Sequence, residues 1–200
     1  YQERKLVTLM PQRRTELKEA IQEKWDESSQ SYDSHHGHGI KTEEERNAWI
    51  KALTPVLPPI GSKVLDVGCG TGEMSLLLAE MGYIVTGIDI SKKMIALARS
   101  KANASELKVR FDPGDAEKLN FKDGSFDAVI NRHLLWTLSR PKDALGEWKR
   151  ILKNEGRMIV VDGLWNDGSL NHRLRRGLGD LSTLLMERKD PRRGWYSKDV

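Results

Sequence analysis

The sequence lacks the features of disulfide-bonded, metal-cluster and membrane-spanning proteins. It contains one cysteine, so it cannot form an internal disulfide or a thiolate metal cluster, and a reducing, cytoplasmic setting is expected. No apolar run approaches the length of about 18 residues that a membrane span needs, so no span is expected. The chain begins at Tyr1 rather than at a methionine, which indicates that the start of the natural chain is missing or was removed.

The remaining composition is that of one α/β domain with a core. Hydrophobic residues make up 38% of the chain, and charged residues make up 31%, which implies a heavily solvated surface. The net charge is +4, with much of the positive surplus near the C-terminal end. A surplus of this size identifies no partner by itself.

The chain is organised around one short stretch, Val64-Leu65-Asp66-Val67-Gly68-Cys69-Gly70-Thr71-Gly72. It predicts a buried strand over 63–67, a tight turn whose backbone is bare for a ligand, and a helix over 73–81. A second strand is predicted over 84–90, and its acid Asp89 stands where such a unit accepts hydrogen bonds from ribose hydroxyls. A dinucleotide-binding turn would carry a third glycine where this chain has Glu73, and a carboxylate there repels a pyrophosphate. The sequence therefore favours a nucleotide cofactor without a pyrophosphate.

These residues resemble the first motif of the class I S-adenosylmethionine-dependent methyltransferases. The resemblance implies a doubly wound, mostly parallel α/β sheet of the Rossmann-like kind, with S-adenosylmethionine as cofactor and S-adenosylhomocysteine as product. It implies that Asp115 takes the exocyclic amine of the adenine. The cofactor-binding residues that we expect are Asp66, Gly68, Cys69, Gly70, Gly72, Asp89, Ile90, Asp115, Ala116 and Asn131.

Each of the three acids also has a purely structural interpretation. Asp66 could orient the glycine turn, Asp89 could cap a helix that begins at Ser91, and Asp115 could close a turn. Cys69 is expected to be a small buried side chain rather than a nucleophile. Further strands are predicted over 107–111, 126–130 and 156–162, with helices over 91–103 and from Pro141.

The segment 131–138 after the fourth predicted strand reads Asn-Arg-His-Leu-Leu-Trp-Thr-Leu. It lacks the Asn/Asp-Pro-Pro-aromatic loop of methyltransferases that act on the amines of bases, so nucleic acid is not the expected acceptor. It is similar to the small-molecule branch that includes the ubiquinone and menaquinone biosynthesis methyltransferases. His133 is the candidate general base, or else it hydrogen-bonds the backbone. Trp136 is expected in the core, with a place near the sulfonium as the alternative.

An N-terminal helical arm is expected over residues 1–59. Helices are predicted over 15–28, as an apolar stripe that packs on a sheet, and over 43–56. The loop between them contains Tyr32, His35, His36 and His38, and three interpretations stay open: an exposed linker, a metal site, or a lid. In a lid, Tyr32 or a histidine such as His35 would face the reacting centre. No metal is assigned, because no cysteine or carboxylate pair stands at a familiar ligand spacing.

The cofactor-binding core is expected over residues 60–165, followed in the same domain by a helical, basic segment over 166–200. The resemblance implies a final hairpin that this sequence does not supply, so the last strands of the fold are expected to be missing. The fifth strand would then be an exposed edge able to pair with a second copy in a homodimer. A polyanion methyltransferase using the basic segment and a non-catalytic cofactor-binding protein are the alternatives to methyl transfer onto a small molecule.

Overall fold

The structure is a computed structural model that describes residues 2–34 and 38–162, with side chains described for 15–34 and 38–162. The expectations for His35, for His36 and for the basic segment 166–200 lie outside the described residues. Among the helices of the described ranges, none combines the length and the apolar character that crossing a membrane requires.

Five parallel strands form one sheet in the order β3-β2-β1-β4-β5. The chain adds strands to one side of β1 first and then returns to add β4 and β5 on the other side. This order confirms the doubly wound α/β fold, and it opens a crevice at the carboxyl ends of β1 and β4, where the direction of addition reverses. The strands are β1 (Lys63–Val67), β2 (Ile84–Asp89), β3 (Arg110–Pro113), β4 (Phe126–Arg132) and β5 (Leu152–Val161).

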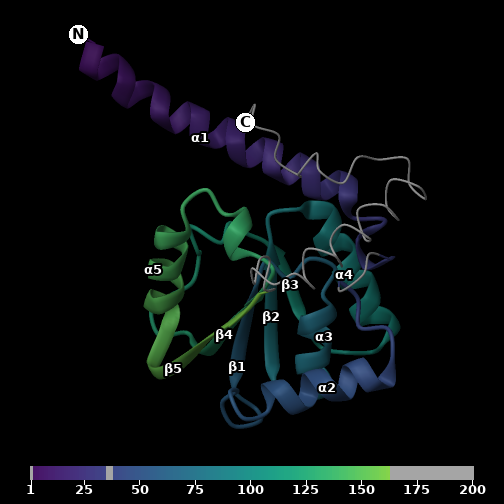
Figure 1. Cartoon of the computed structure of the whole chain (residues 1–200). Coiled ribbons are helices and arrows are strands. Elements are labelled where there is room, and N and C mark those ends of the chain that lie inside the picture. The colour runs from purple at the N-terminus through teal and green to yellow at the C-terminus, as the bar shows by residue number, and fades with distance from the viewer. Residues whose placement is uncertain (1, 35–37, 163–200) are drawn as a thin grey trace, which may run out of the picture. The chain divides into compact units, whose positions relative to one another are not determined.

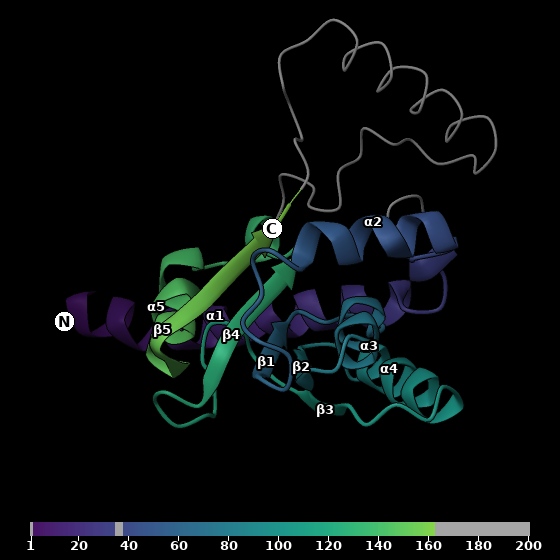
Figure 2. The same ribbon diagram turned by 90° about the horizontal axis from the view of Figure 1, so that it is seen from below.

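Helices cover both faces of the sheet (Figure 2). On one face α2 (Glu43–Leu53), α3 (Glu73–Glu80) and α4 (Lys92–Ala104) bury apolar side chains against β1, β2 and β3. On the other face α5 (Pro141–Ile151) buries Trp148 completely against the strands. Two short 3-10 helices, η1 (Tyr32–Ser34) and η2 (Leu135–Thr137), lie in the connections.

The apolar stripe of the long helix α1 (Gln2–Ser28) predicted that this helix packs on a face of the sheet, but it does not. It crosses above the carboxyl ends of the strands (Figure 1), where Asp26 accepts hydrogen bonds from the Ser91 hydroxyl at 2.5 Å and the Lys93 amide at 3.1 Å. Both faces of the sheet are already covered by other helices, so the apolar stripe covers the open crevice instead. This placement makes α1 the roof of the crevice.

Several predicted boundaries differ from the structure, and the first helix begins at Gln2 rather than at residue 15. The third strand begins at Arg110 rather than at residue 107, and α2 ends at Leu53 rather than at 56. The fifth strand begins at Leu152 rather than at residue 156. Its pairing with β4 is irregular between Phe126 and Ala128, and Glu155 takes a φ of 66° in this part of the strand. Within the described residues β5 is an edge strand, and its pairing in a homodimer stays a prediction.

Candidate functional site

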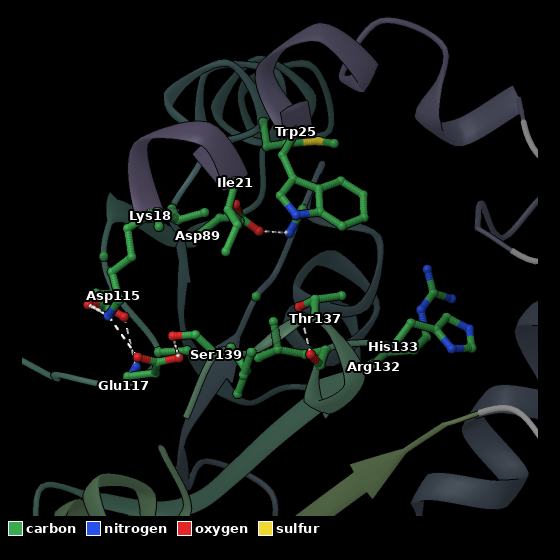
Figure 3. Close-up of a pocket in the computed structure, with 18 of the residues that line it drawn as sticks. Lys18, Ile21, Trp25, Asp89, Asp115, Glu117, Arg132, His133, Thr137 and Ser139 are labelled. Atoms are coloured by element: carbon green, nitrogen blue, oxygen red, sulfur yellow. Dashed lines mark hydrogen bonds and ion pairs between the residues drawn. The ribbon is translucent and has the colours of Figure 1, made fainter. Parts of the chain in front are cut away.

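A deep cavity lies in the crevice at the carboxyl ends of the strands, beneath α1 (Figure 3). It encloses about 720 Å³, part of it open to solvent, which is a common size for a small-molecule site. Its walls come from seven places in the chain, namely α1, η1, the glycine turn, the end of β2, α4, the segment after β3, and the end of β4 with the segment after it. The lining residues are Lys18, Ile21, Trp25, Tyr32, Gly68, Gly70, Asp89, Ile90, Met94, Gly114, Asp115, Ala116, Glu117, Arg132, His133, Leu134, Thr137, Leu138 and Ser139.

The glycine turn presents bare backbone to this cavity at Gly70. The residue has a φ of +53°, and its amide donates to the Asp89 carboxylate at 2.9 Å. A Cβ placed there would meet nothing closer than the Tyr32 ring at 3.5 Å, so the space above its α-carbon is open to a ligand. Gly72 differs, because a Cβ there would lie 2.9 Å from Phe111 and 3.0 Å from Ala98. Gly72 is needed for packing and does not line the cavity.

Asp89 ends β2 at the wall of the cavity, and its carboxylate is held in place from two sides. One oxygen accepts the Gly70 amide and the other accepts the Ser91 amide at 2.8 Å. The cap of α4 is the Ser91 hydroxyl, which accepts from the Met94 amide at 3.1 Å. Burial raises the pKa of Asp89 to about 6, although these two amide bonds oppose the rise. A carboxylate fixed in this way can accept two neighbouring hydroxyl groups of a ligand.

A smaller, polar cavity adjoins the first and shares four of its lining residues. Its walls carry Tyr32, Asp66, Gly68, Cys69, Gly70, Thr71, Glu73, Met74 and Arg132. Asp66 is 1% exposed and accepts the Ser75 hydroxyl of α3 at 2.6 Å. Burial raises the pKa of Asp66 to about 6, opposed by that hydrogen bond and by Arg132. Cys69 is buried, as expected, and burial raises the pKa of its thiol.

At the other end of the large cavity, Asp115 and Ala116 follow β3 and are joined to the roof helix. Lys18 of α1 forms an ion pair with Asp115 and a second one with Glu117 at 2.9 Å (Figure 3). One Asp115 oxygen also accepts the Glu117 amide at 2.9 Å. Lys18 and Glu117 were missed by sequence reasoning. The helical period predicted the apolar stripe of α1, but nothing in it indicated that the polar neighbour Lys18 would meet two acids.

Two of the residues predicted for catalysis lie at the cavity, and a third lies outside the described residues. Tyr32 and His133 line the cavity, and burial raises the pKa of Tyr32 to about 12. His35 lies outside the described residues, while His38 packs against Tyr32 with ring centroids 4.4 Å apart. The His133 backbone amide donates to the Val161 carbonyl at 3.0 Å. Its side chain turns instead to Asp162, with 3.4 Å between Nδ1 and Oδ1.

Two expectations, one for β4 and one for the segment after it, need correction. Trp136 was expected in the core, but it lies on η2 with 43% of its surface exposed and does not line the cavity, because the 3-10 turn carries it outward. Asn131 was expected to bind the cofactor, but it is 1% exposed within β4 and lines neither of the two cavities. The next residue, Arg132, lines both cavities and donates to the His38 carbonyl, a role that the sequence did not predict.

A polar network fastens η1 over the glycine turn. The Asp33 carboxylate accepts the Thr71 hydroxyl at 2.5 Å and the Lys101 ammonium at 2.7 Å. Lys101 also contacts Glu73 at 2.5 Å, and Glu73 accepts the Ile40 amide at 3.0 Å. The pairing with Lys101 offsets the negative charge of Glu73 at the start of α3. The network holds Tyr32, which precedes Asp33, above Gly70.

Replacing Lys101 with methionine is expected to loosen this network. The change leaves two carboxylates without their shared cation, so we expect the affinity for S-adenosylhomocysteine to fall about fivefold, or about 1 kcal/mol. Isothermal titration calorimetry measures the effect. The control is Lys92→Met, since Lys92 is exposed on the same helix. Equal affinities for the two variants would show that the network does not position the site.

The raised pKa of Asp89 predicts pH-dependent binding of a ligand whose hydroxyls need the ionised carboxylate. The carboxyl takes up a proton as the pH falls through about 6, so binding weakens on the acid side. Affinity for S-adenosylhomocysteine should fall about tenfold between pH 7 and pH 5. The variant Asp89→Asn, which cannot ionise at this position, should bind weakly and lose the part of the slope that Asp89 contributes. Burial also raises the pKa of Asp66 to about 6, so a wild-type slope in the variant would assign the titration to Asp66 instead.

Among the described side chains, no three histidine, cysteine, aspartate or glutamate residues are grouped so that they could hold a metal ion. The cavity offers backbone amides that donate, carboxylates that accept, and aromatic edges. Such groups suit an organic ligand that has hydroxyl groups and a flat ring. The bare α-carbon of Gly70 beside Asp89 fits the adenosine part of S-adenosylmethionine.

Comparisons with known proteins agree with this geometry. A family profile described as a methyltransferase domain matches residues 65–160. The demethylmenaquinone methyltransferase of Thermus thermophilus is 39% identical over 114 residues, which cover 56% of this chain and 52% of that protein. The chain spans about half the length of these curated relatives.

Two solved structures match over larger shares of their own length. The PH0226 protein of Pyrococcus horikoshii is 31% identical with a TM-score of 0.58, and the match covers 78% of this chain and 71% of that one. A SAM-dependent methyltransferase of Methanosarcina mazei is 30% identical with a TM-score of 0.55, and the match covers 70% and 68%. The cofactor of such proteins is S-adenosylmethionine, and this chain belongs to the S-adenosylmethionine-dependent methyltransferases.

Proposed function

We propose that this chain transfers a methyl group from S-adenosylmethionine to a small-molecule acceptor by direct displacement. The observation that carries the proposal is the cavity at the reversal of the strand order, where the bare backbone of Gly70 lies beside the fixed carboxylate of Asp89. When bound, the cofactor supplies a methyl group on a positively charged sulfur that leaves as a neutral thioether. The protein then has to bind, align and exclude water.

The residues present fit this cofactor along its whole length. Asp89 is assigned to the ribose hydroxyls, and Asp115 and Ala116 to the adenine, with Ile90 as an apolar wall. The smaller polar cavity suits the amino-acid end, because Asp66 offers a carboxylate and Arg132 a guanidinium there. Gly72 and Asn131, which line neither cavity, are given no direct contact with the cofactor.

The roof helix α1 explains how water is kept from the reacting groups. Ile21 and Trp25 place apolar surface over the cavity, and Lys18 and Asp26 fasten the helix to the ends of β3 and α4. A helix that covers a cavity with apolar side chains and is held by a few polar contacts can open for ligands and close again. The arrangement supports transfer to an acceptor small enough to fit beneath a closed helix.

A screen of acceptors with methyl-labelled S-adenosylmethionine tests the proposal. The first acceptor to try is a reduced demethylmenaquinone analogue, because a relative's name indicates that substrate. The panel should add phenols, thiols, amines and an RNA at low and high salt. Label in any small molecule supports the proposal, label in RNA with strong salt dependence favours the polyanion alternative, and binding without transfer to any acceptor favours a non-catalytic role.

A further inference from the structure

We propose that His133 is the base that accepts the acceptor's proton, that Asp162 positions its ring, and that the acceptor is a phenolic or enolic hydroxyl compound. The inference rests on the proposed methyl transfer and goes beyond it, because it assigns an orienting residue and a chemical class of substrate. Asp162 was not expected to take part from the sequence.

The ends of two neighbouring strands bring His133 and Asp162 together. His133 follows β4 and Asp162 follows β5, so the pair is 29 positions apart in the chain but adjacent at the sheet edge. The His133 amide donates to the Val161 carbonyl at 3.0 Å, which fixes the backbone of one partner to that of the other. Nδ1 of His133 then lies 3.4 Å from Oδ1 of Asp162.

The backbone of His133 is in a conformation that side chains rarely adopt. Its φ is +57°, and only Glu106 and Glu155 share a positive φ among the described residues other than glycine. Such a conformation costs about 1 kcal/mol or more and is found where a side chain must point in a required direction. His133 lines the cavity, and 22% of its side chain is exposed. Figure 3 shows it beside Arg132 at the edge of the lining residues.

A carboxylate next to Nδ1 gives the imidazole a defined chemical role. Asp162 accepts the Nδ1 proton, which leaves the lone pair on Nε2 as the basic site of the neutral ring. Tyr32 is a poor alternative base, because its phenol is buried and stays protonated near neutral pH.

The rim also indicates the shape of the acceptor. Four aromatic rings form a series at the rim of the cavity, in the order Trp25, Tyr32, His38 and His133. The distances between successive ring centroids are 6.0, 4.4 and 6.0 Å. Trp25, Tyr32 and His133 line the cavity. Flat conjugated molecules bind well against such edges. A flat molecule that also needs a base is a phenol or an enol, since a carboxylate is already ionised.

The proton balance of the proposed step is simple. The hydroxyl proton moves to Nε2 of His133, and the electron pair left on oxygen, or delocalised onto the neighbouring ring carbon, forms the bond to the methyl carbon. The electrons of the broken carbon–sulfur bond remain on the sulfur. His133 then releases its proton to water, so one proton is produced for each methyl group transferred.

The first test measures the tautomer of the His133 ring and needs no methyl transfer. Nitrogen NMR on the protein with S-adenosylhomocysteine, at about pH 8.5 where an imidazole is neutral, reports which ring nitrogen carries the proton. We expect the proton on Nδ1 in the wild type and on Nε2 in Asp162→Asn, whose amide can donate to Nδ1, with the wild-type pattern restored in Asp162→Glu. A wild-type proton on Nε2, or no change in Asp162→Asn, would overturn the role of Asp162.

The second test compares two related acceptors, 1,4-naphthohydroquinone, which is largely neutral, and 2-hydroxy-1,4-naphthoquinone, which is already ionised. The base-deficient variant is His133→Asn, because asparagine tolerates a positive φ. Its rate should fall about 10²- to 10⁴-fold with the neutral acceptor and less than about threefold with the ionised one. An equal loss of rate with both acceptors would show that His133 has only a structural role. No loss of rate with either would show that His133 takes no part in the reaction.

The two proposals fail in different ways. Label transfer by the wild type to amines or thiols alone would leave methyl transfer standing and overturn the hydroxyl class and the base. Absence of transfer to every acceptor, with S-adenosylhomocysteine still bound, would overturn methyl transfer and this inference with it. Calorimetric affinity of each variant for S-adenosylhomocysteine shows whether a lost rate reflects lost binding.

Discussion

Replacing Asp89 with alanine is expected to weaken the binding of S-adenosylhomocysteine by about 100-fold or more. Two hydrogen bonds from ribose hydroxyls to a charged acceptor contribute about 3 kcal/mol together, which corresponds to that factor. The change also removes the acceptor of the Gly70 and Ser91 amides, so the turn that forms the floor of the cavity loses its anchor. Calorimetry on the folded variant, checked by its circular dichroism spectrum, measures the loss.

The matched control for this variant is Asp127→Ala. Asp127 also accepts a backbone amide, that of Lys63 at 2.8 Å, and pairs with Lys153 at 2.7 Å, but it lies at the start of β4, away from the cavity. It should cost comparable stability and leave the affinity unchanged. Wild-type affinity in a folded Asp89→Ala protein would show that the ribose does not bind this carboxylate.

Replacing Gly70 with valine should abolish measurable binding of S-adenosylhomocysteine, a loss of about 1,000-fold or more. The added methyl groups occupy the open space above the α-carbon, and an approaching ligand cannot displace them because they are fixed to the backbone. The smaller substitution Gly70→Ala should reduce the affinity for S-adenosylhomocysteine by an intermediate factor.

A positive φ strains any side chain, so the effect on the ligand has to be separated from strain. Gly124 has a φ of +62°, close to the +53° of Gly70, and a Cβ there meets nothing nearer than 4.0 Å. Gly124→Val should therefore destabilise the fold by a similar amount without changing affinity. If both variants bind as the wild type does, the cofactor does not approach Gly70.

The sequence predicted the parts of the site that depend on a short stretch of chain. The turn 68–72 and Asp89 follow from a strand that ends in an acid and glycines, and the structure has them at the cavity wall, Gly72 excepted. The doubly wound sheet follows from the same alternation of strand and helix patterns. These patterns are local, so they could be read without coordinates.

The parts that were missed depend on contacts between distant segments. Lys18 meets Asp115 from 97 positions away, and its role depends on where α1 lies, which its period does not determine. His133 and Asp162 meet because β4 and β5 are neighbours in the sheet. Trp136 was misplaced because hydrophobicity predicts burial only on average, and a 3-10 turn after β4 turns this side chain outward.

The most direct test of the account is a crystal structure of the protein with S-adenosylhomocysteine. We expect the ligand beneath α1, with both ribose hydroxyls on the Asp89 carboxylate and the adenine beside Asp115 and Ala116. We also expect the sulfur on the side of Tyr32 and His133, where an acceptor can reach it. A ligand bound outside this cavity, or a ribose that makes no contact with Asp89, would contradict the account.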